Sequence, residues 1–358
     1  MKKIIGACGA VVLAAVCAAC ANGTKEKEMD PAGEPVVLSG DSIAVDQILL
    51  PYSIVVKEDR ALLQSRSTDT VFYAFSLPDF RFLYKTGVRG NGPDDFLEGN
   101  VLDFPDARRI VVDQMMQGRV DVFDFSDQGL RKVRSLANSR MYYRPRVMVN
   151  DSIAVVECYD WAAKTAGVYT YNFARRAVVD SLPEVQTWVR SIKMGRELSA
   201  LVNMFHVFGY GEYFALSYYM MNRIEFYRVS PQGRIKPVKA LGQERVDPAL
   251  ERYGRDAKGS VQDFDQIPLF VYFGVASPEH LFVANLHGMT PSERDERDRE
   301  GTLGMSLDVY TWDGRLAGRI QLPVRGLFAV SEKYRRIYAI DPRRDFEYIY
   351  TYSYDFEK

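Results

Sequence analysis

The chain has 358 residues, a mass of 40.8 kDa and a formal net charge of −1 at pH 7. Its 47% hydrophobic and 13% aromatic residues exclude an intrinsically disordered chain, and the balanced charge gives no electrostatic basis for binding nucleic acid. The length allows a large buried core and would by itself suggest about two domains. The 22 Tyr and 20 Phe residues favour strands over helices.

The first twenty residues have the features of an export signal. A pair of lysines follows Met1, and the apolar run Ile4–Val16 is too short to span a bilayer. The small residues before Cys20 resemble a bacterial lipobox, although Cys17 stands where Leu or Val is usual. We therefore expect residues 1–19 to be a lipoprotein signal peptide and Cys20 to carry the lipid that anchors the chain to a membrane. An ordinary secretory peptide is the alternative.

Residues 20–35 are rich in charged and small side chains, which predicts a flexible tether between the lipid and the folded domain. Lys25–Glu28 loosely resembles the acidic tags that send some Gram-negative lipoproteins to the cell surface, but a solvated linker explains it equally simply. After cleavage only Cys158 would remain beside the lipidated cysteine, so no internal disulfide is expected. The expected location is the cell envelope, at the outer membrane, with its periplasmic or surface side left open.

From Ser53 onward, one pattern of four apolar runs recurs along the chain. Tight turns such as Ser126–Gly129 and Ser230–Gly233 join the third run to the fourth, and their Asp, Pro and Gly residues favour turn geometry. Runs such as Val120–Phe125 alternate apolar and polar residues, which predicts half-buried antiparallel strands. The six units span Ser53–Thr86, Val101–Leu136, Arg146–Leu182, Val202–Leu241, Leu269–Leu322 and Gly326–Tyr354.

Units of four short strands that repeat about every 40 residues or more predict a β-propeller. The sixth unit ends after its third strand, whereas the apolar segment Pro35–Val45 belongs to no unit. We therefore predict an all-β fold, a six-bladed β-propeller of four-stranded antiparallel blades whose ring is closed by an N-terminal strand. Closure would leave no long open sheet edge. Residues 36–358 are expected to form this single domain.

The stretch Gly90–Phe96, which follows the first unit, carries a family resemblance. Its sequence GNGPDDF resembles the Gly-x-Gly-Pro-x-Glu-Phe motif of the TolB-like six-bladed propeller lipoproteins of Gram-negative, Bacteroides-like bacteria, with Asp95 in place of glutamate. Together with Cys20 and the six units, the resemblance covers nearly the whole mature chain. It implies the architecture and an exported, lipid-anchored protein. It implies little about activity, because the family is recognised by its fold and largely lacks an assigned function.

The long connections all fall on one side of the predicted ring. In a propeller, the turns between first and second strands and between third and fourth strands lie on one face, and the other connections lie opposite. The long segments of this chain belong to the second set: Gly87–Asn100, Cys158–Ala166, Pro183–Leu201, Gly242–Pro268 and Leu286–Gly304. Long loops on a rigid scaffold often carry binding function, so we assign function to this loop-rich face. Within these loops, Glu184–Leu201 is expected to be a short helix, and the charge-alternating Ser292–Glu300 a solvated loop tip, for which a helix is one option and a binding role the alternative.

Ten residues of this face are candidate contacts to a ligand or partner. Met and aromatic residues are favoured at partner-binding surfaces, but packing between blades explains them equally well. In the first long connection we expect a structural turn with glycine at positive φ, flanked by charged surface residues. The ten candidates are Arg89, Asp94, Asp95, Met115, Met116, Tyr159, Trp161, Tyr218, Tyr219 and His287.

The second strands end in polar residues, which ring closure would gather near the channel. Such a ring can bind a cation or a polar ligand, although hydrogen bonding at strand ends is the simpler explanation. The residues concerned are Asp113, Glu157, Ser217, Asn285 and Asp341.

Sequence motifs of enzymes are absent: the chain has no HExxH, GxSxG or Walker loop. His206 alternates within a strand and is interpreted as structural, and His287 is the only histidine with a plausible catalytic position. We therefore predict no enzyme activity, no cofactor and no metal site.

The sequence favours a lipid-anchored, non-catalytic module that binds a peptide, protein or glycan through its loop-rich face. One alternative is a propeller hydrolase or lyase acting on a sugar or lactone, which would require carboxylates and a histidine converging in the channel mouth. A second alternative is a structural subunit of an envelope complex.

Overall fold

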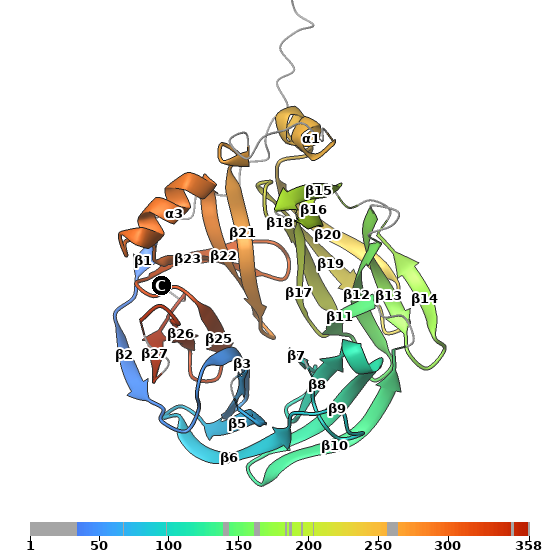
Figure 1. Ribbon diagram of the computed structural model, residues 1–358, viewed down its shortest axis with the longest axis vertical. Helices are drawn as coiled ribbons and strands as arrows, with labels where there is room; N and C mark the ends of the chain where they lie inside the picture. The colour runs from blue at the N-terminus through green and yellow to red at the C-terminus, as the bar shows by residue number, and fades with distance from the viewer. Residues whose placement is uncertain are drawn as a thin grey trace, which may run out of the picture.

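Six antiparallel sheets stand radially around a common centre, which confirms the predicted all-β six-bladed propeller (Figure 1). The computed structural model describes residues 34–356, apart from 67, 98, 139–142, 161–164, 183–184, 186–187, 195, 203, 256–263 and 345–346. The predicted signal peptide, nearly all of the tether and Cys20 therefore lie outside the described residues.

Each of the first three blades is a four-stranded meander. The first contains β3 (Pro51–Lys57), β4 (Arg60–Ser65), β5 (Thr70–Ser76) and β6 (Arg81–Val88). The second contains β7 (Asn100–Asp103), β8 (Arg109–Gln114), β9 (Arg119–Ser126) and β10 (Gly129–Ala137). The third contains β11 (Tyr143–Met148), β12 (Ile153–Asp160), β13 (Thr165–Asn172) and β14 (Ala177–Ser181).

The remaining blades follow the same plan. The fourth contains β17 (Phe205–Tyr210), β18 (Tyr213–Tyr218), β19 (Arg223–Val229) and β20 (Ile235–Gly242). The fifth contains β21 (Leu269–Ala276), β22 (His280–Met289), β23 (Met305–Thr311) and β24 (Leu316–Leu322). The sixth contributes β25 (Leu327–Ser331), β26 (Arg336–Ile340) and β27 (Tyr348–Ser353) from the C-terminal part of the chain.

The N-terminal segment closes the ring, as predicted. Strand β2 (Gly40–Ala44) pairs antiparallel with β27 and becomes the outer strand of the sixth blade. The short strand β1 (Val36–Val37) pairs parallel with β24 and adds a fifth strand to the fifth blade, which the sequence pattern did not predict. The N-terminal segment thus joins the last two blades.

The hydrophobic core lies between the blades. Second and third strands such as β8 and β9 are buried over most of their length, because neighbouring blades cover both faces. Six apolar clusters result, one at each interface between adjacent blades. Between the first two blades, Phe72 and Phe96 meet edge to face with ring centroids 4.8 Å apart. Burying a side chain of this size stabilises the fold by roughly 1.5–3 kcal/mol.

Among the described residues, the long connections contain a hairpin of β15 (Trp188–Met194) and β16 (Arg196–Val202), α1 (Pro248–Arg255) and α3 (Pro291–Arg299), and the short β8–β9 connection contains η1 (Met115–Gln117). The loop tip Ser292–Glu300 is largely helical, as α3, and a capping box between Thr290 and Glu293 fixes the start of this helix. The helix expected over Glu184–Leu201 is wrong. Its β-branched residues favour strands and its central glycine disfavours a helix, so the segment pairs with itself.

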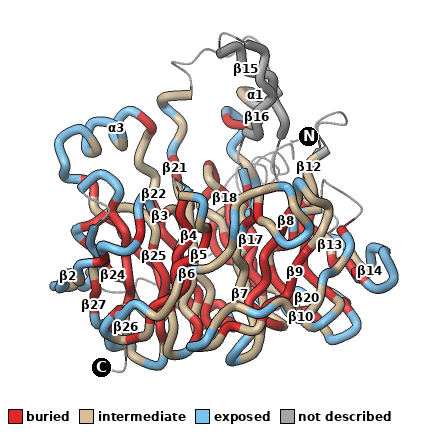
Figure 2. The backbone as a smooth tube through the Cα atoms, turned by 60° about the horizontal axis from the view of Figure 1, so that its bottom comes forward, coloured by how far each residue is buried: buried red, intermediate tan, exposed pale blue. Residues whose placement is uncertain are grey.

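The two faces of the ring differ as the sequence predicted. In Figure 2, α1 and α3 rise from one face, and the tight turns between strands form the opposite face. We call these the loop-rich face and the turn face. None of the helices in the described part of the chain combines the length and hydropathy needed to cross a membrane.

Candidate functional site in the central channel

A cavity of about 440 Å³ occupies the centre of the ring. Residues of all six first strands line it, because the first strand of each blade is the innermost one. Its volume lies within the range of about 300–1,000 Å³ that is usual for small-molecule sites. The lining combines aromatic rings, including Phe208, Tyr210 and Phe273, with charged side chains at two levels of the channel.

The level nearer the loop-rich face contains Arg146, Glu157 and His206. Arg146 is an extra residue in its strand: the register between β11 and β12 shifts between Pro145 and Val147, which leaves Arg146 without a partner in the ladder. Such a β-bulge re-aims a side chain and is common beside functional sites. The Arg146 Nε atom donates a hydrogen bond to the buried Glu157 carboxylate. The bulge thus sets a charged pair in the wall of the channel.

Burial changes the protonation of the groups around Arg146. Burial raises the pKa of Asp113 to about 7, even though the nearby guanidinium groups of Arg146 and Arg144 oppose the change. The pKa of Glu157 is also raised by burial, against the opposing effect of Arg146. Burial, assisted by the positive charge of Arg146, lowers the pKa of His206 to about 4, so this imidazole is neutral at pH 7. Perturbed groups gathered at a cavity are typical of functional sites.

The polar residues expected at the ends of the second strands are almost fully buried. Asn285 donates to Asp308 at 2.8 Å, and Asp341 accepts from Arg343 at 3.1 Å. Buried atoms of the other blades have no hydrogen-bond partner among the described residues: Gln64 Oε1, Asp113 Oδ1, His206 Nε2 and Ser217 Oγ. Such atoms need a hydrogen bond from water or a ligand. Hydrogen bonding is therefore satisfied at the third blade, where Glu157 pairs with Arg146, and at the fifth and sixth blades, and it is incomplete at the first, second and fourth.

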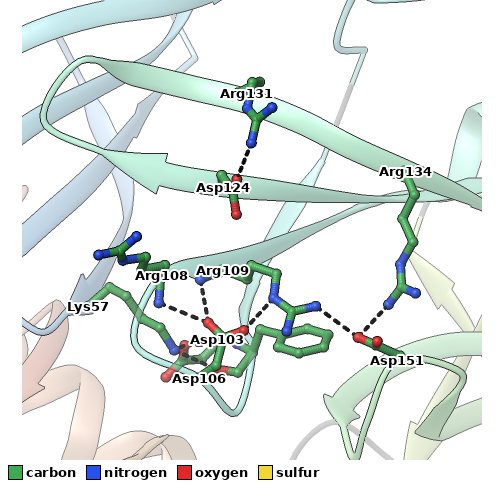
Figure 3. Close-up of polar contacts among 10 residues, drawn as sticks. Lys57, Asp103, Asp106, Arg108, Arg109, Asp124, Arg131, Arg134 and Asp151 are labelled. Carbon is green, nitrogen blue, oxygen red and sulfur yellow. Dashed lines mark hydrogen bonds and ion pairs between the residues drawn. The ribbon is translucent and has the colours of Figure 1, made fainter.

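The level nearer the turn face is dominated by Lys57. Its side chain is only 3% exposed, and its Nζ atom donates to Asp103 and to the carbonyl oxygen of Phe104. The same ammonium lies 5.6 Å from the centroid of the Tyr210 ring. Figure 3 shows Lys57 beside Asp103. These contacts connect the first, second and fourth blades, and they hold a buried charge in place.

A chain of ion pairs continues outward from this level (Figure 3). Arg109 pairs with Asp106 and, at 2.9 Å, with Asp151 of the third blade, which also accepts from Arg134 at 2.8 Å. The Arg109 guanidinium stacks over Phe104, 4.5 Å from the ring centroid. These partly exposed pairs tie neighbouring blades together.

The candidates from the first long connection have partners within the protein. Arg89 donates to the carbonyl oxygens of Ser65 at 2.7 Å and Leu97 at 3.2 Å, which fixes the loop. The Asp95 carboxylate accepts from the Gly92 amide at 2.8 Å. Asp94 is exposed and pairs with Lys132. Arg89 and Asp95 therefore stabilise the turn through hydrogen bonds, and Asp94 lies at the surface.

The turn itself is built differently from the expectation. Neither Gly90 nor Gly92 has positive φ, and only Gly87 of this stretch does, at +80°. The two glycines are needed because Asp95 approaches closely: a Cβ atom would lie 2.4 Å from Asp95 Oδ2 at Gly90 and 2.7 Å from it at Gly92. Glycine is used here for close packing and not for a left-handed backbone.

The aromatic and methionine candidates divide between core and surface. Tyr218 is fully buried between the third and fourth blades, and Tyr159 stacks on Phe205 with ring centroids 5.4 Å apart. Tyr219 accepts a hydrogen bond from Arg294 of α3 at 3.0 Å. Met115 is half-buried, whereas Met116 is 60% exposed in η1. Trp161 lies outside the described residues.

His287 lies away from this channel in a second cavity, beneath α3. Its Nε2 atom is 3.0 Å from Ser306 Oγ and 3.7 Å from Asp308 Oδ1. A Ser-His-Asp triad uses both imidazole nitrogens, whereas here the serine and the carboxylate face the same nitrogen. Asp308 is moreover bound by Asn285 and Arg319. The arrangement does not activate Ser306 as a nucleophile.

Two residues of the channel site were missed by the sequence analysis: Arg146 and His206. A proline followed by arginine inside a strand, Pro145–Arg146, is the one signal that could have indicated a bulge. His206 was interpreted as structural because nothing in the sequence places it beside Glu157.

Comparison with known families supports the architecture. Residues 35–167 match the family described as TolB-like 6-blade propeller-like. The match covers a little over a third of the chain, so it shows a similarity to this family over the first blades, while the six-bladed ring itself is seen in the structure. A search of curated proteins gave no match to it.

Two solved structures from Bacteroides resemble this propeller over most of its length. A member of the duf4221 family from Bacteroides vulgatus has a TM-score of 0.55 at 12% identity, over 90% of this chain and 98% of that one. A Bacteroides fragilis protein described as exported also has a TM-score of 0.55, at 10% identity, over 91% of this chain and 97% of that one. At sequence identities this low, the similarity shows a shared fold and carries no further conclusion.

Proposed function

We propose that this propeller is a lipid-anchored envelope protein that binds a small hydroxyl-rich ligand, such as a sugar unit of a glycan, in its central channel. The observation that carries the proposal is at the loop-rich end of the 440 Å³ cavity, where the Arg146–Glu157 pair lies in the lining together with His206, whose buried Nε2 atom has no hydrogen-bond partner among the described residues.

The chemistry of the lining favours a sugar over a peptide or protein. Within the lining, Arg146 supplies hydrogen-bond donors, Glu157 supplies acceptors, and the imidazole of His206 has a nitrogen without a partner among the described residues, a combination that suits hydroxyl groups, which both donate and accept. Aromatic rings such as Phe208 and Phe273 offer apolar surface for the faces of a sugar ring. The cavity is closed in by all six blades, so it suits a compact ligand better than an extended chain.

The exported, lipid-anchored state rests on the sequence features around Cys20. The described exported state of the Bacteroides fragilis neighbour agrees with this assignment. In an envelope setting, the tether would hold the propeller near the membrane while leaving the channel accessible.

The test is a thermal-shift and calorimetric screen of mono- and disaccharides with the detergent-solubilised full-length protein. The informative variant is Arg146→Gln combined with Glu157→Gln, which removes both members of the pair and leaves no buried charge uncompensated. The matched control is Arg131→Gln combined with Asp124→Asn, an ion pair of 2.6 Å outside the channel. We expect at least one sugar to bind the wild type and the control, and to bind the channel variant at least tenfold more weakly. Equal binding by both variants would refute the proposal.

A second candidate is the hydrolase or lyase on a sugar or lactone. The specific observation in its favour is that Glu157 and His206 line the cavity together with Arg146, and that the positive charge of Arg146 also acts on the buried carboxyl group of Asp113. A carboxyl group with a pKa near 7 can act as an acid or a base at neutral pH. Release of reducing sugar or opening of a lactone ring, lost in Asp113→Asn, would favour this candidate over simple binding.

A further inference from the structure

We propose that Glu279, His280 and Glu332 bind a divalent transition-metal ion at the turn-face rim of the channel. Glu279 and His280 lie at the turn between β21 and β22, and Glu332 lies at the turn between β25 and β26. The fifth and sixth blades are adjacent, so the two turns meet. The ligand atoms of the three side chains all lie within 4.8 Å of one another.

This spacing is close to what a metal ion needs. Oxygen and nitrogen ligands at about 2.0–2.2 Å from zinc can be at most about 4.4 Å apart, so small side-chain movements suffice. One imidazole with two carboxylates suits Zn²⁺, Mn²⁺ or Fe²⁺, whereas Ca²⁺ and Mg²⁺ prefer oxygen ligands alone. Glu332 and the neighbouring Ser277 also line the central cavity, which gives an ion a path to the site.

Hydrogen bonds from neighbouring residues fix the orientation of the Glu332 carboxylate. Ser277 Oγ and Tyr354 OH donate to the Glu332 carboxylate, the latter at 2.9 Å. Hydrogen bonds from His280, Ser277 and Tyr354 hold the pKa of Glu332 below its usual range although burial opposes them. Such second-layer hydrogen bonds are what position the ligands of protein metal sites.

Part of the cluster has a different explanation. His280 and Glu332 could simply hold the two blades together through their hydrogen bond, an arrangement we call the clasp. His280 Nδ1 lies 3.0 Å from Glu332 Oε1, which alone would connect β22 to the sixth blade. Glu279 distinguishes the explanations, because it is exposed and takes no part in this clasp, yet it completes the set of three ligands. The clasp alone requires no metal affinity and no role for Glu279.

The experiment is a calorimetric titration of Zn²⁺ into chelator-treated, detergent-solubilised full-length protein. A Cys158→Ser background removes the half-buried thiol as a competing zinc ligand. Absorption of bound Co²⁺ reports the geometry independently. We expect one equivalent of Zn²⁺ to bind with micromolar or tighter affinity and to raise the melting temperature.

The variant Glu279→Gln should weaken Zn²⁺ binding at least tenfold while leaving the melting temperature of the metal-free protein unchanged. His280→Ala should abolish binding, and the control His287→Asn should bind as the parent does. Absence of stoichiometric binding would overturn the proposal, and so would equal affinity in Glu279→Gln. Because the site lies at the opposite end of the channel from Arg146, this result is independent of sugar binding.

Discussion

Asp113 is a carboxyl group that is only 2% exposed and lies near two guanidinium groups. Its pKa of about 7 in the folded state exceeds the ordinary value of 3.8, so the folded protein retains a proton that the unfolded chain releases. Stability is therefore lost as the pH rises from about 4 to about 7, and the loss is constant above that range. It amounts to at most about 4 kcal/mol.

The substitution Asp113→Asn tests this account, because asparagine has the same shape and cannot ionise. We expect the variant to be more stable than the wild type at pH 8, with a much smaller difference at pH 4.5. Denaturant unfolding of both proteins at the two pH values measures this. A variant less stable than the wild type at pH 8 would contradict this, because it would show that interactions of the ionised Asp113 carboxylate outweigh the cost of burying its charge.

In the first long connection, Gly92 and Asp95 form one structural unit. Gly92→Ala would place Cβ 2.7 Å from Asp95 Oδ2, and overpacking of this kind costs about 1–3 kcal/mol. Asp95→Ala should also lower the melting temperature, because it removes the acceptor for the Gly92 amide. Exposed Asp94→Ala is the control and should melt as the wild type does. A normal melting temperature for Gly92→Ala would contradict this interpretation.

The contacts and burial of single residues were the hardest features to predict from the sequence. The sequence indicated the turn around Gly92 but not the reason for its glycines, because the approach of Asp95 depends on the folded loop. Likewise Tyr218 is compatible with either a surface or a core position until its strand is placed between two blades.

Among the elements, β2 has the clearest structural task. It pairs with β27 along five residues, and Val45 at its end is 1% exposed in the core between the sixth and first blades. Deleting Pro35–Val45 should therefore expose the edge of β27 and lower the free energy of unfolding by several kcal/mol. Deleting only Val36 and Val37, which are 59% and 73% exposed, should have a small effect. Equal unfolding midpoints for both deletions would show that β2 does not hold the ring closed.

Elements with a strong repeating pattern were predictable, and irregular ones were not. The blade strands alternate and end at recognisable turns, and α3 begins with a capping box. In contrast, β1 has only two residues, too few to carry a pattern. The segment that forms β15 and β16 has apolar residues at helical spacing, and only strand pairing distinguishes it from a helix.

For the molecule as a whole, membrane attachment remains a prediction from the sequence. Cys20→Ser should release the protein from the membrane fraction or block removal of the signal peptide. Fractionation and mass measurement of the wild type and the variant check this. Unchanged membrane association with normal processing would exclude Cys20 as the anchor.

The whole ring also explains why the channel site escaped sequence analysis. Asp113, Glu157 and His206 belong to three different blades and meet only because the ring closes. The repeat predicts that such residues face a common channel. It cannot predict the β-bulge that brings Arg146 among them.

The central claim is that the channel, and not the outer surface of the loops, holds the ligand. The most direct measurement is a crystal structure of the protein grown with the sugar that binds most tightly in the screen. The account predicts density for the sugar inside the ring, within hydrogen-bonding distance of Arg146, Glu157 or His206. Density confined to the outer loops, for example around the exposed Met116, would contradict it.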